Sequence, residues 1–307
     1  MISRLKALIR ALAHLQESID EIKINQGLIL TKLQQLPALT NDTNDNSNHE
    51  FKIFSQWGED GILQFITSSI FIENKTFIEF GVHDFMESNC RFLLIKDGWS
   101  GFVIDGSKKN IQRLRENQMY WKYPLQAISA FITKENIAEL LDSSGFNKNC
   151  GILSIDIDGV DWHILNQLTE WNASIVVVEY NSIFGANLSV TVPYTPDFNR
   201  SRAHYSDLYW GASLSAFSNL LINRGYSLVA TNTNGNNAFF VKSALLTDKI
   251  KSKSPSDCFQ EATFRESKGL DGQIVHVPHQ SRRNAIAHLP LVNTITGQIE
   301  TLDKLKA

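Results

Sequence analysis

The sequence lacks features that mark several large classes of protein. Its three cysteines, Cys90, Cys150 and Cys258, contain no CxxC pair, and this odd, scattered set argues against a disulfide framework. No uncharged apolar run reaches about 18 residues, so we expect no transmembrane helix. The net charge is −3, so no global basic field would recruit nucleic acid. These absences predict a cytoplasmic protein without a nucleic-acid partner.

Two motifs are also missing. The N-terminus carries Arg4, Lys6 and Arg10 among apolar residues, and a signal peptide is excluded because these charges interrupt its apolar core. There is no complete GxGxxG phosphate loop, which weakens the case for a dinucleotide such as NAD. A cofactor without phosphate groups would need only one close backbone approach at a glycine.

The first 36 residues show a heptad pattern that is typical of a coiled coil. Nine of the ten a and d positions are apolar, and Gln26 is the polar exception. The a positions are Leu5, Leu12, Ile19, Gln26 and Leu33, and the d positions are Leu8, Leu15, Ile22, Ile29 and Leu36. The sustained repeat predicts a left-handed coiled coil and a homo-oligomer. The alternative is an amphipathic helix that packs on its own domain or makes peripheral contact with a membrane surface.

Composition divides the chain into four parts. Residues 1–37 form the predicted coiled-coil helix, which Pro37 ends. Residues 38–50 are rich in Asn, Asp and Thr and are typical of a linker. A globular domain spans residues 51–245. Residues 246–307 are less regular, and we expect them to pack on that domain as a C-terminal extension.

Strand and helix patterns alternate from residue 51 to residue 245. Strands are predicted at 76–80, 101–104, 124–129, 152–156, 175–179, 226–230 and 238–241, and helices start near Ser55 or cover 87–96, 108–118, 134–142 and 213–223. This alternation predicts an α/β fold whose mostly parallel sheet is covered on both faces. The last two strands have no helix between them, so we expect an antiparallel hairpin at the sheet edge.

Acidic residues follow two neighbouring strands of the predicted sheet. Asp156 and Asp158 end the strand in LSIDIDG, while Glu179 and Asn181 end the next strand in VVVEYN. Ligands in open α/β sheets bind at the carboxyl ends of the strands. Asp156, Glu179 and Asn181 are the oxygen ligands that a hard cation such as Mg²⁺ would need. Alternatively, one carboxylate acts as a general base, or some of them only cap the following helix.

The first predicted strand offers a second group of candidates. It reads FIEFGVHD, with Glu79 near its end, Gly81 in the turn and His83 as a candidate catalytic histidine. Asp105 ends the second strand, 24 residues after Gly81. An acidic residue at about this spacing usually accepts hydrogen bonds from ribose hydroxyls in nucleoside-binding α/β folds. The alternative is an Asp that only caps the helix after it.

A long loop, residues 184–213, carries the candidate substrate-binding residues. Long loops without regular structure are typical of lids and binding loops. The aromatic and arginine side chains here would suit a polar ring such as a sugar, and we assign this role to Tyr194, Arg202, Tyr209 and Trp210. A packed loop without a binding role is the alternative.

Taken together, these motifs resemble the FkbM-type branch of class I methyltransferases, which use S-adenosylmethionine. The resemblance covers residues 51–243 and rests on SQWGEDG, FIEFGVHDFMESN, GWSGFVIDGS, LSIDIDGVDWHIL, VVVEYN, YWGASL and NAFFV, in the expected order. It implies a Rossmann-like seven-stranded sheet of order 3-2-1-4-5-7-6. Two departures stand out: the first loop has Phe85 or Met86 near the place of a second glycine, and IDIDG lacks the usual Glu before its glycine.

The resemblance also implies roles for individual residues. Glu79 and Gly81 would contact the methionine part of the cofactor, Asp105 would bind its ribose, and Ser129 and Ala130 would flank its adenine. Gly106 would also contact the cofactor. Asp156 and Asp158 would face the methyl group and the acceptor, with Asp158 as the base. The implied reaction is O-methylation of a sugar or surface-glycan hydroxyl, as in lipopolysaccharide or capsule. The alternatives are a non-catalytic coiled-coil scaffold with a degenerate domain, or an NAD-dependent oxidoreductase.

Overall fold

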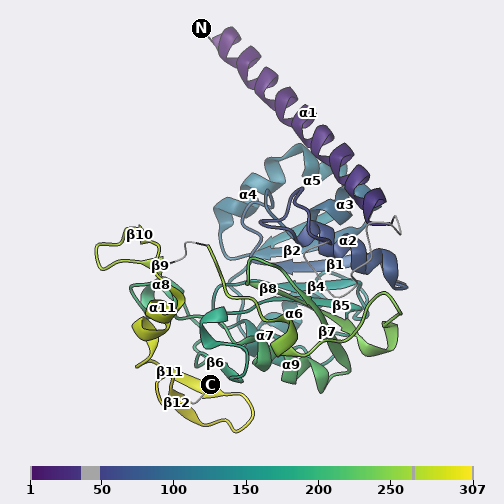
Figure 1. Cartoon of the computed structure of the whole chain (residues 1–307). Coiled ribbons are helices and arrows are strands. Elements are labelled where there is room, and N and C mark those ends of the chain that lie inside the picture. The colour runs from purple at the N-terminus through teal and green to yellow at the C-terminus, as the bar shows by residue number, and fades with distance from the viewer. Residues whose placement is uncertain (1, 36–48, 265–266, 306–307) are drawn as a thin grey trace.

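A seven-stranded sheet forms the centre of the molecule, and one long helix extends away from it (Figure 1). The computed structural model describes residues 2–35, 49–264 and 267–305. The long helix is α1 (Ile2–Gln34), with 33 residues. Among the described helices, none combines the length and the apolar character that crossing a membrane requires. Most of the predicted linker, residues 38–48, lies outside the described residues.

The strand order of the sheet is β3-β2-β1-β4-β5-β8-β7. Its strands are β1 (Thr76–Phe80), β2 (Ser100–Asp105), β3 (Leu125–Ser129), β4 (Ile152–Ile155), β5 (Ile175–Glu179), β7 (Tyr226–Thr231) and β8 (Asn237–Lys242). The first five run parallel, whereas β8 is antiparallel to both β5 and β7. Strand β6 (Val190–Thr191) belongs to a different sheet, so this is the predicted order 3-2-1-4-5-7-6 with its hairpin at the edge. The α/β fold class is confirmed.

Helices cover both faces of the sheet, because its strands carry apolar residues on both sides. One face packs against α2 (Glu59–Ser69), α3 (Arg91–Asp97), α4 (Lys108–Glu116) and α5 (Gln118–Lys122). The other packs against α6 (Ile137–Asp142), α7 (Asp161–Gln167) and α9 (Leu214–Ile222). Neighbouring β1 residues point to opposite faces: Phe77 joins the first layer and Ile78 the second. This period of two is that of a strand buried on both sides.

Several helix boundaries differ from the prediction, and at three of these helices a side chain binds the backbone first. Helix α2 begins at Glu59 rather than near Ser55, because the buried Asp60 carboxylate accepts the backbone amides of residues 53–55. Helix α3 begins at Arg91, since Glu79 takes the amides just before it. The predicted helix 108–118 is two helices, because Asn117 has extended backbone angles and accepts the amide of Met119 at 2.9 Å. Such local side-chain bonds compete with helix formation.

The two sides of α1 have different surroundings. Its eight heptad positions with described side chains, from Leu8 to Leu33, are all exposed; Leu5 and Leu36 lie outside the described side chains. The other side packs on the domain near Phe92, where a Cβ added at Gly27 would lie 2.5 Å from the Phe92 ring. The glycine lets α1 approach α3 closely, while the described side chains of the heptad stripe remain exposed.

An ion pair ties α1 to the loop that follows β1. The guanidinium of Arg91 is almost fully buried and lies 3.0 Å from the Asp20 carboxylate on α1. The same guanidinium donates to the Met86 carbonyl at 2.8 Å and lies over the Phe54 ring. One side chain therefore connects α1, α3 and residues 83–89.

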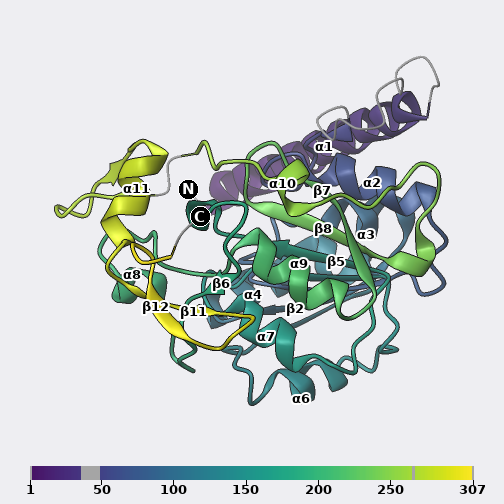
Figure 2. The ribbon, with the colours of Figure 1, turned by 60° about the horizontal axis from the view of Figure 1, so that its bottom comes forward.

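The C-terminal segment contacts the domain through a small sheet and a helix (Figure 2). The segment forms α10 (Pro255–Cys258), β9 (Ser267–Lys268), β10 (Ile274–Val275), α11 (His279–Ile286), β11 (Pro290–Asn293) and β12 (Ile299–Thr301). Strand β11 pairs antiparallel with β6, and Ile286, Leu291 and Leu302 are buried in the core of the domain. The segment thus covers part of the long loop after β5.

Candidate functional site

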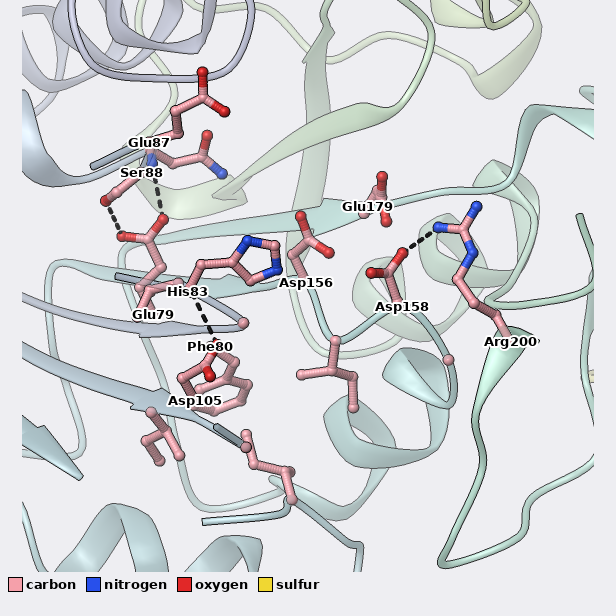
Figure 3. Close-up of a pocket in the computed structure, with 18 of the residues that line it drawn as sticks. Glu79, Phe80, His83, Glu87, Ser88, Asp105, Asp156, Asp158, Glu179 and Arg200 are labelled. Atoms are coloured by element: carbon pink, nitrogen blue, oxygen red, sulfur yellow. Dashed lines mark hydrogen bonds and ion pairs between the residues drawn. The ribbon is translucent and has the colours of Figure 1, made fainter. Parts of the chain in front are cut away.

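A cavity of about 1020 Å³ opens at the carboxyl ends of β1, β2, β4 and β5. Its walls come from the loop after β1 (residues 81–89), the ends of the other three strands and residues 198–201 of the long loop. Figure 3 shows side chains from these separate segments pointing into the same space. This is the edge at which open α/β sheets bind their ligands.

The loop after β1 is organised around Glu79. Its buried carboxylate accepts the Ser88 hydroxyl at 2.6 Å, the Asn89 amide at 2.8 Å and the Cys90 amide at 3.3 Å. Burial raises the pKa of Glu79 to about 7, although these hydrogen bonds oppose the shift. Glu79 therefore both shapes the loop and lines the cavity.

Position 81 has no room for a side chain, because the backbone at the end of the neighbouring strand β4 lies against it. Its φ is +71°, and a Cβ at this position would lie 1.6 Å from the carbonyl oxygen of Asp156. The sequence suggested that this glycine permits a ligand to approach, whereas the closest neighbour is the end of β4. Farther along the loop, His83 and Phe85 also adopt positive φ values of 49° and 62°, so the loop turns without a second glycine.

Asp105 links the loop after β1 to the start of α4. One carboxylate oxygen accepts the His83 amide at 2.8 Å, and the other accepts the Ser107 amide at 2.8 Å. The oxygen that binds Ser107 also accepts the Asn110 side-chain amide at 3.4 Å, whereas the oxygen that binds His83 keeps further acceptor capacity. The residue lines the cavity next to Gly106. An apolar wall of Ile104, Ala130, Phe131 and Ile132 lies beside them.

The opposite side of the cavity holds three carboxyl groups. Oxygen atoms of Asp156, Asp158 and Glu179 all lie within 4.8 Å of one another. Burial raises the pKa of Asp156 well above its ordinary value, and the charge of Asp158 adds to this. Burial likewise raises the pKa of Glu179, with the charge of Asp156 as the next cause. Two carboxyl groups this close, the half-buried Asp156 and the buried Glu179, favour a shared proton.

Donors are scarce around this cluster. The Oε2 atom of Glu179 is buried and accepts no hydrogen bond from the residues that the structure describes. From the described residues its Oε1 atom receives one long bond, 3.4 Å, from the Asn236 side chain. Asp158 has a φ of 55° and forms an ion pair with Arg200 (Figure 3). A proton or a ligand is therefore the natural partner of Asp156 and Glu179.

Asp161 holds the backbone that carries this cluster. Its buried carboxylate accepts the amides of Ile157 at 2.8 Å and Gly159 at 2.9 Å. Burial raises its pKa to about 6. Asp161 is also the first residue of α7 (Asp161–Gln167), so one side chain both begins this helix and holds the turn before it.

Arg200 is a cavity residue that the sequence reasoning did not select. It begins the short helix α8 (Arg200–Ala203) in the long loop. Its guanidinium carbon lies 5.0 Å from the Trp210 ring centre, and its Nε donates to the Asp207 carbonyl. Beside it, Phe198 packs against Gly159, where an added Cβ would lie 2.7 Å from the ring. The long loop thus forms one wall of the cavity.

Most of the predicted site residues meet at this cavity. Those that line it are Glu79, Gly81, His83, Asp105, Gly106, Ala130, Asp156, Asp158 and Glu179. His83 is exposed and directs its imidazole between Glu79 and Asp156 (Figure 3). They converge because parallel strands end at the same edge of the sheet.

Other predicted site residues lie outside the lining of this cavity. Asn181, a predicted metal ligand, is buried, and its side-chain amide donates to the carbonyls of Leu208 and Trp210, each at 3.0 Å. Ser129 belongs to β3 but does not reach the cavity. Trp210, a predicted substrate contact, is 2% exposed and lies under Arg200.

The remaining three substrate candidates are also engaged elsewhere. Tyr209 is buried and donates its hydroxyl to the Pro290 carbonyl. Tyr194 donates to Glu135 at 2.6 Å, and Arg202 donates to the Asp197 carbonyl at 2.8 Å on the surface. Local contacts of this kind leave no sequence signal, because the loop has no periodicity.

Comparison with protein-family models and with curated proteins gives no match. Among solved structures, the chain is similar to a putative caffeoyl-CoA O-methyltransferase from Staphylococcus aureus (15% identity, TM-score 0.42, covering 72% of this chain and 99% of that one). It is also similar to the N-terminal domain of EvdMO1 with SAH bound (12%, 0.39, 64% and 83%). A third match is the CurJ carbon methyltransferase (9%, 0.39, 77% and 70%). At these identities and TM-scores the likenesses carry no weight for function, which rests on the cavity.

Proposed function

We propose that the protein is an S-adenosylmethionine-dependent O-methyltransferase that acts on a hydroxyl group of a sugar or surface glycan. The observation that carries this proposal is the cavity itself. It places Glu79 and Asp105 on one side and the Asp156–Glu179 pair on the other, all at the carboxyl edge of a sheet of order β3-β2-β1-β4-β5-β8-β7. FkbM-type membership belongs to the same proposal.

The first side of the cavity suits an adenosyl cofactor. Asp105 keeps acceptor capacity for a ribose hydroxyl on its Oδ2 atom, and the apolar wall with Ala130 and Phe131 suits a flat adenine ring. Glu79, whose pKa is raised to about 7, would be ionised beside a positively charged ligand. The cofactor would supply a methyl group that its sulfonium already activates, so the protein mainly positions the acceptor and removes its proton.

The second side suits proton removal from a hydroxyl. The Asp156–Glu179 pair has raised pKa values, which a general base that works near neutral pH requires. The sequence favoured Asp158 as the base, but Arg200 already binds that carboxylate. We therefore propose the pair as the base and Asp158 as the residue that positions the loop through Arg200.

A divalent cation at the three carboxyls is the alternative occupant. We favour the shared proton because Arg200 already balances Asp158, and because Asn181, the neutral ligand in the prediction, is committed to two carbonyls. The two arrangements make opposite predictions. A chelator leaves turnover unchanged if a proton is shared, and it abolishes turnover if Mg²⁺ is required.

Calorimetry with S-adenosylmethionine, S-adenosylhomocysteine and NAD tests the function. We expect both adenosyl compounds to bind and NAD not to bind, because the phosphate-binding loop is missing. Loss of binding in Asp105→Ala would place the adenosyl group at β2. A protein that binds none of the three is a scaffold rather than an enzyme, and one that binds only NAD is an oxidoreductase.

We also propose that α1 pairs with α1 of a second copy through its exposed heptad stripe. The helix can bind the domain and a second copy at once, because these contacts use different sides. The domain packs on the side of Gly27 and leaves Leu12, Leu15 and Ile22 exposed. Light scattering on Leu15→Glu/Ile22→Glu should show a smaller assembly than the parent protein. An unchanged mass would reject pairing through this stripe.

A further inference from the structure

The ionisable side chains around the cavity are mostly acidic. Seven carboxyl groups line it: Glu79, Asp84, Glu87, Asp105, Asp156, Asp158 and Glu179. Among the described lining residues, Arg200 is the one guanidinium or ammonium group, and Asp158 already pairs with it. Arg265 and Glu266, which follow Phe264 in the sequence and lie outside the described residues, carry opposite charges. A cavity lined by one sign of charge concentrates ligands of the opposite sign and repels those of its own.

The backbone donors that ordinarily bind anions are also occupied. A helix N-terminus binds phosphate through its free amides. Here Glu79 takes the amides of Asn89 and Cys90 before α3, and Asp105 takes the amide of Ser107 before α4.

The same holds at the end of β4. Asp161 takes the amides of Ile157 and Gly159 in the turn that leads into α7. In this way the chain's own carboxylates already take five backbone amides at three turns around the cavity, which removes those donors from a phosphate group.

What the cavity offers instead is unused acceptor capacity. The buried Oε2 of Glu179 has no donor among the described residues, and Asp156 lies beside it (Figure 3). Phe198 and Phe264 add apolar surface to the lining. Carboxylates next to apolar rings suit a ligand that has several hydroxyl or ammonium donors on an apolar frame.

From these observations we infer the charge class of the acceptor. It is a neutral or amine-bearing polyhydroxy compound, and alcohols that carry phosphate, sulfate or carboxylate groups, nucleotide sugars among them, are excluded. This inference rests on the proposed function in one respect, namely that the cavity receives an acceptor. The charge preference itself follows from the lining residues and can be measured without turnover.

The first experiment uses probes that do not require the true acceptor. Inorganic phosphate and the ammonium polyol tris(hydroxymethyl)aminomethane are each titrated into the full-length protein by calorimetry. We expect the ammonium polyol to bind at least about tenfold more tightly than phosphate. Glu179→Gln should reduce this preference, whereas Glu170→Gln, an exposed glutamate paired with Lys148 away from the cavity, should leave it unchanged. Equal affinity for the two probes, or saturable phosphate binding that Arg200→Gln removes, overturns the inference.

The second experiment measures methyl transfer from labelled S-adenosylmethionine to three pools of saccharides. The pools share carbon frames and differ in charge: neutral sugars, amino sugars, and phosphorylated sugars with uronates. We expect labelled product from the neutral or amino pool, and product mainly from the anionic pool would overturn the inference. Absence of adenosyl-cofactor binding in calorimetry rejects the proposed function separately, and the two probes still decide the charge preference.

Discussion

The two sides of the cavity use their carboxylates differently. On the side of β1 and β2, Glu79 and Asp105 accept five backbone or hydroxyl hydrogen bonds from their own chain, which fix the loop after β1 and the start of α4. On the side of β4 and β5, Asp156 and Glu179 meet one another and few donors. The first side is built before a ligand arrives, whereas the second remains incomplete until a proton or ligand joins it.

The largest effect should come from the incomplete side. Glu179→Gln removes one of the two carboxyl groups that we propose as the general base. We expect turnover to fall by roughly 10²–10⁴-fold, the usual contribution of general base catalysis. Cofactor affinity should stay within about threefold, since Glu179 lies across the cavity from Asp105. Steady-state kinetics with calorimetry checks both values. An equal loss of cofactor affinity would contradict the division between the two sides.

A change on the side of β1 and β2 should instead lower cofactor affinity and thermal stability. Asp105→Asn weakens the bonds to the His83 and Ser107 amides, and a hydrogen bond to a charged group contributes about 1.5–3 kcal/mol. We expect a lower melting temperature and cofactor affinity reduced by about tenfold or more. Thermal denaturation and calorimetry measure these effects. A variant that keeps both would remove Asp105 from the cofactor site.

The pH dependence of cofactor binding should sharpen the comparison. Burial raises the pKa of Glu79 from 4.5 to about 7, so the carboxyl is neutral below that value and ionised above it. Affinity for a cationic cofactor should therefore rise as the pH increases through about 7. The contribution of Glu79 to the free energy of unfolding changes in the opposite direction, being present at low pH and lost as the pH rises through about 7.

Titration calorimetry at several pH values tests this, with Glu79→Gln as the comparison. The variant should show a flat profile over the same interval. A rise of equal size in the variant would assign the pH dependence to another group, and a fall in the parent protein would contradict the sign.

The smallest effect should come from the ion pair beside the cluster. Asp158→Asn frees Arg200 and loosens the wall formed by residues 198–201, so we expect a higher KM for the acceptor and a few-fold lower kcat. Steady-state kinetics at saturating cofactor measures this. Complete loss of turnover would restore Asp158 to the role of base that the sequence suggested.

The sequence was informative where regular strands position residues. Strand β5 ends at Glu179, and the parallel order brings Glu79, Asp105 and Asp156 to one edge by geometry alone. It failed in the long loop, where Arg200 enters the cavity while Arg202, two residues later, faces the surface. No periodic pattern distinguishes these two arginines, because their directions depend on contacts with Trp210 and Asp207 that only the folded chain supplies.

Helix boundaries were limited for a related reason. Asp60 and Glu79 bind the amides ahead of α2 and α3, and these bonds shorten helices that propensity alone would begin earlier. A carboxylate that lies inside a predicted helix or strand cannot be assigned to a distant amide without the fold. Asp161, which closes the turn after β4, belongs to the same class.

The buried guanidinium of Arg91 has a practical consequence for anyone who shortens this chain. It joins Asp20 of the long helix to the carbonyl of Met86, whose side chain lines the cavity. A truncation made after residue 35 would strip a counter-charge from the interior and unsettle the cavity wall. A truncation that removes only residues before Asp20 keeps the ion pair between Asp20 and Arg91. The length retained at the N-terminus therefore decides whether a fragment keeps the cavity of the full-length protein.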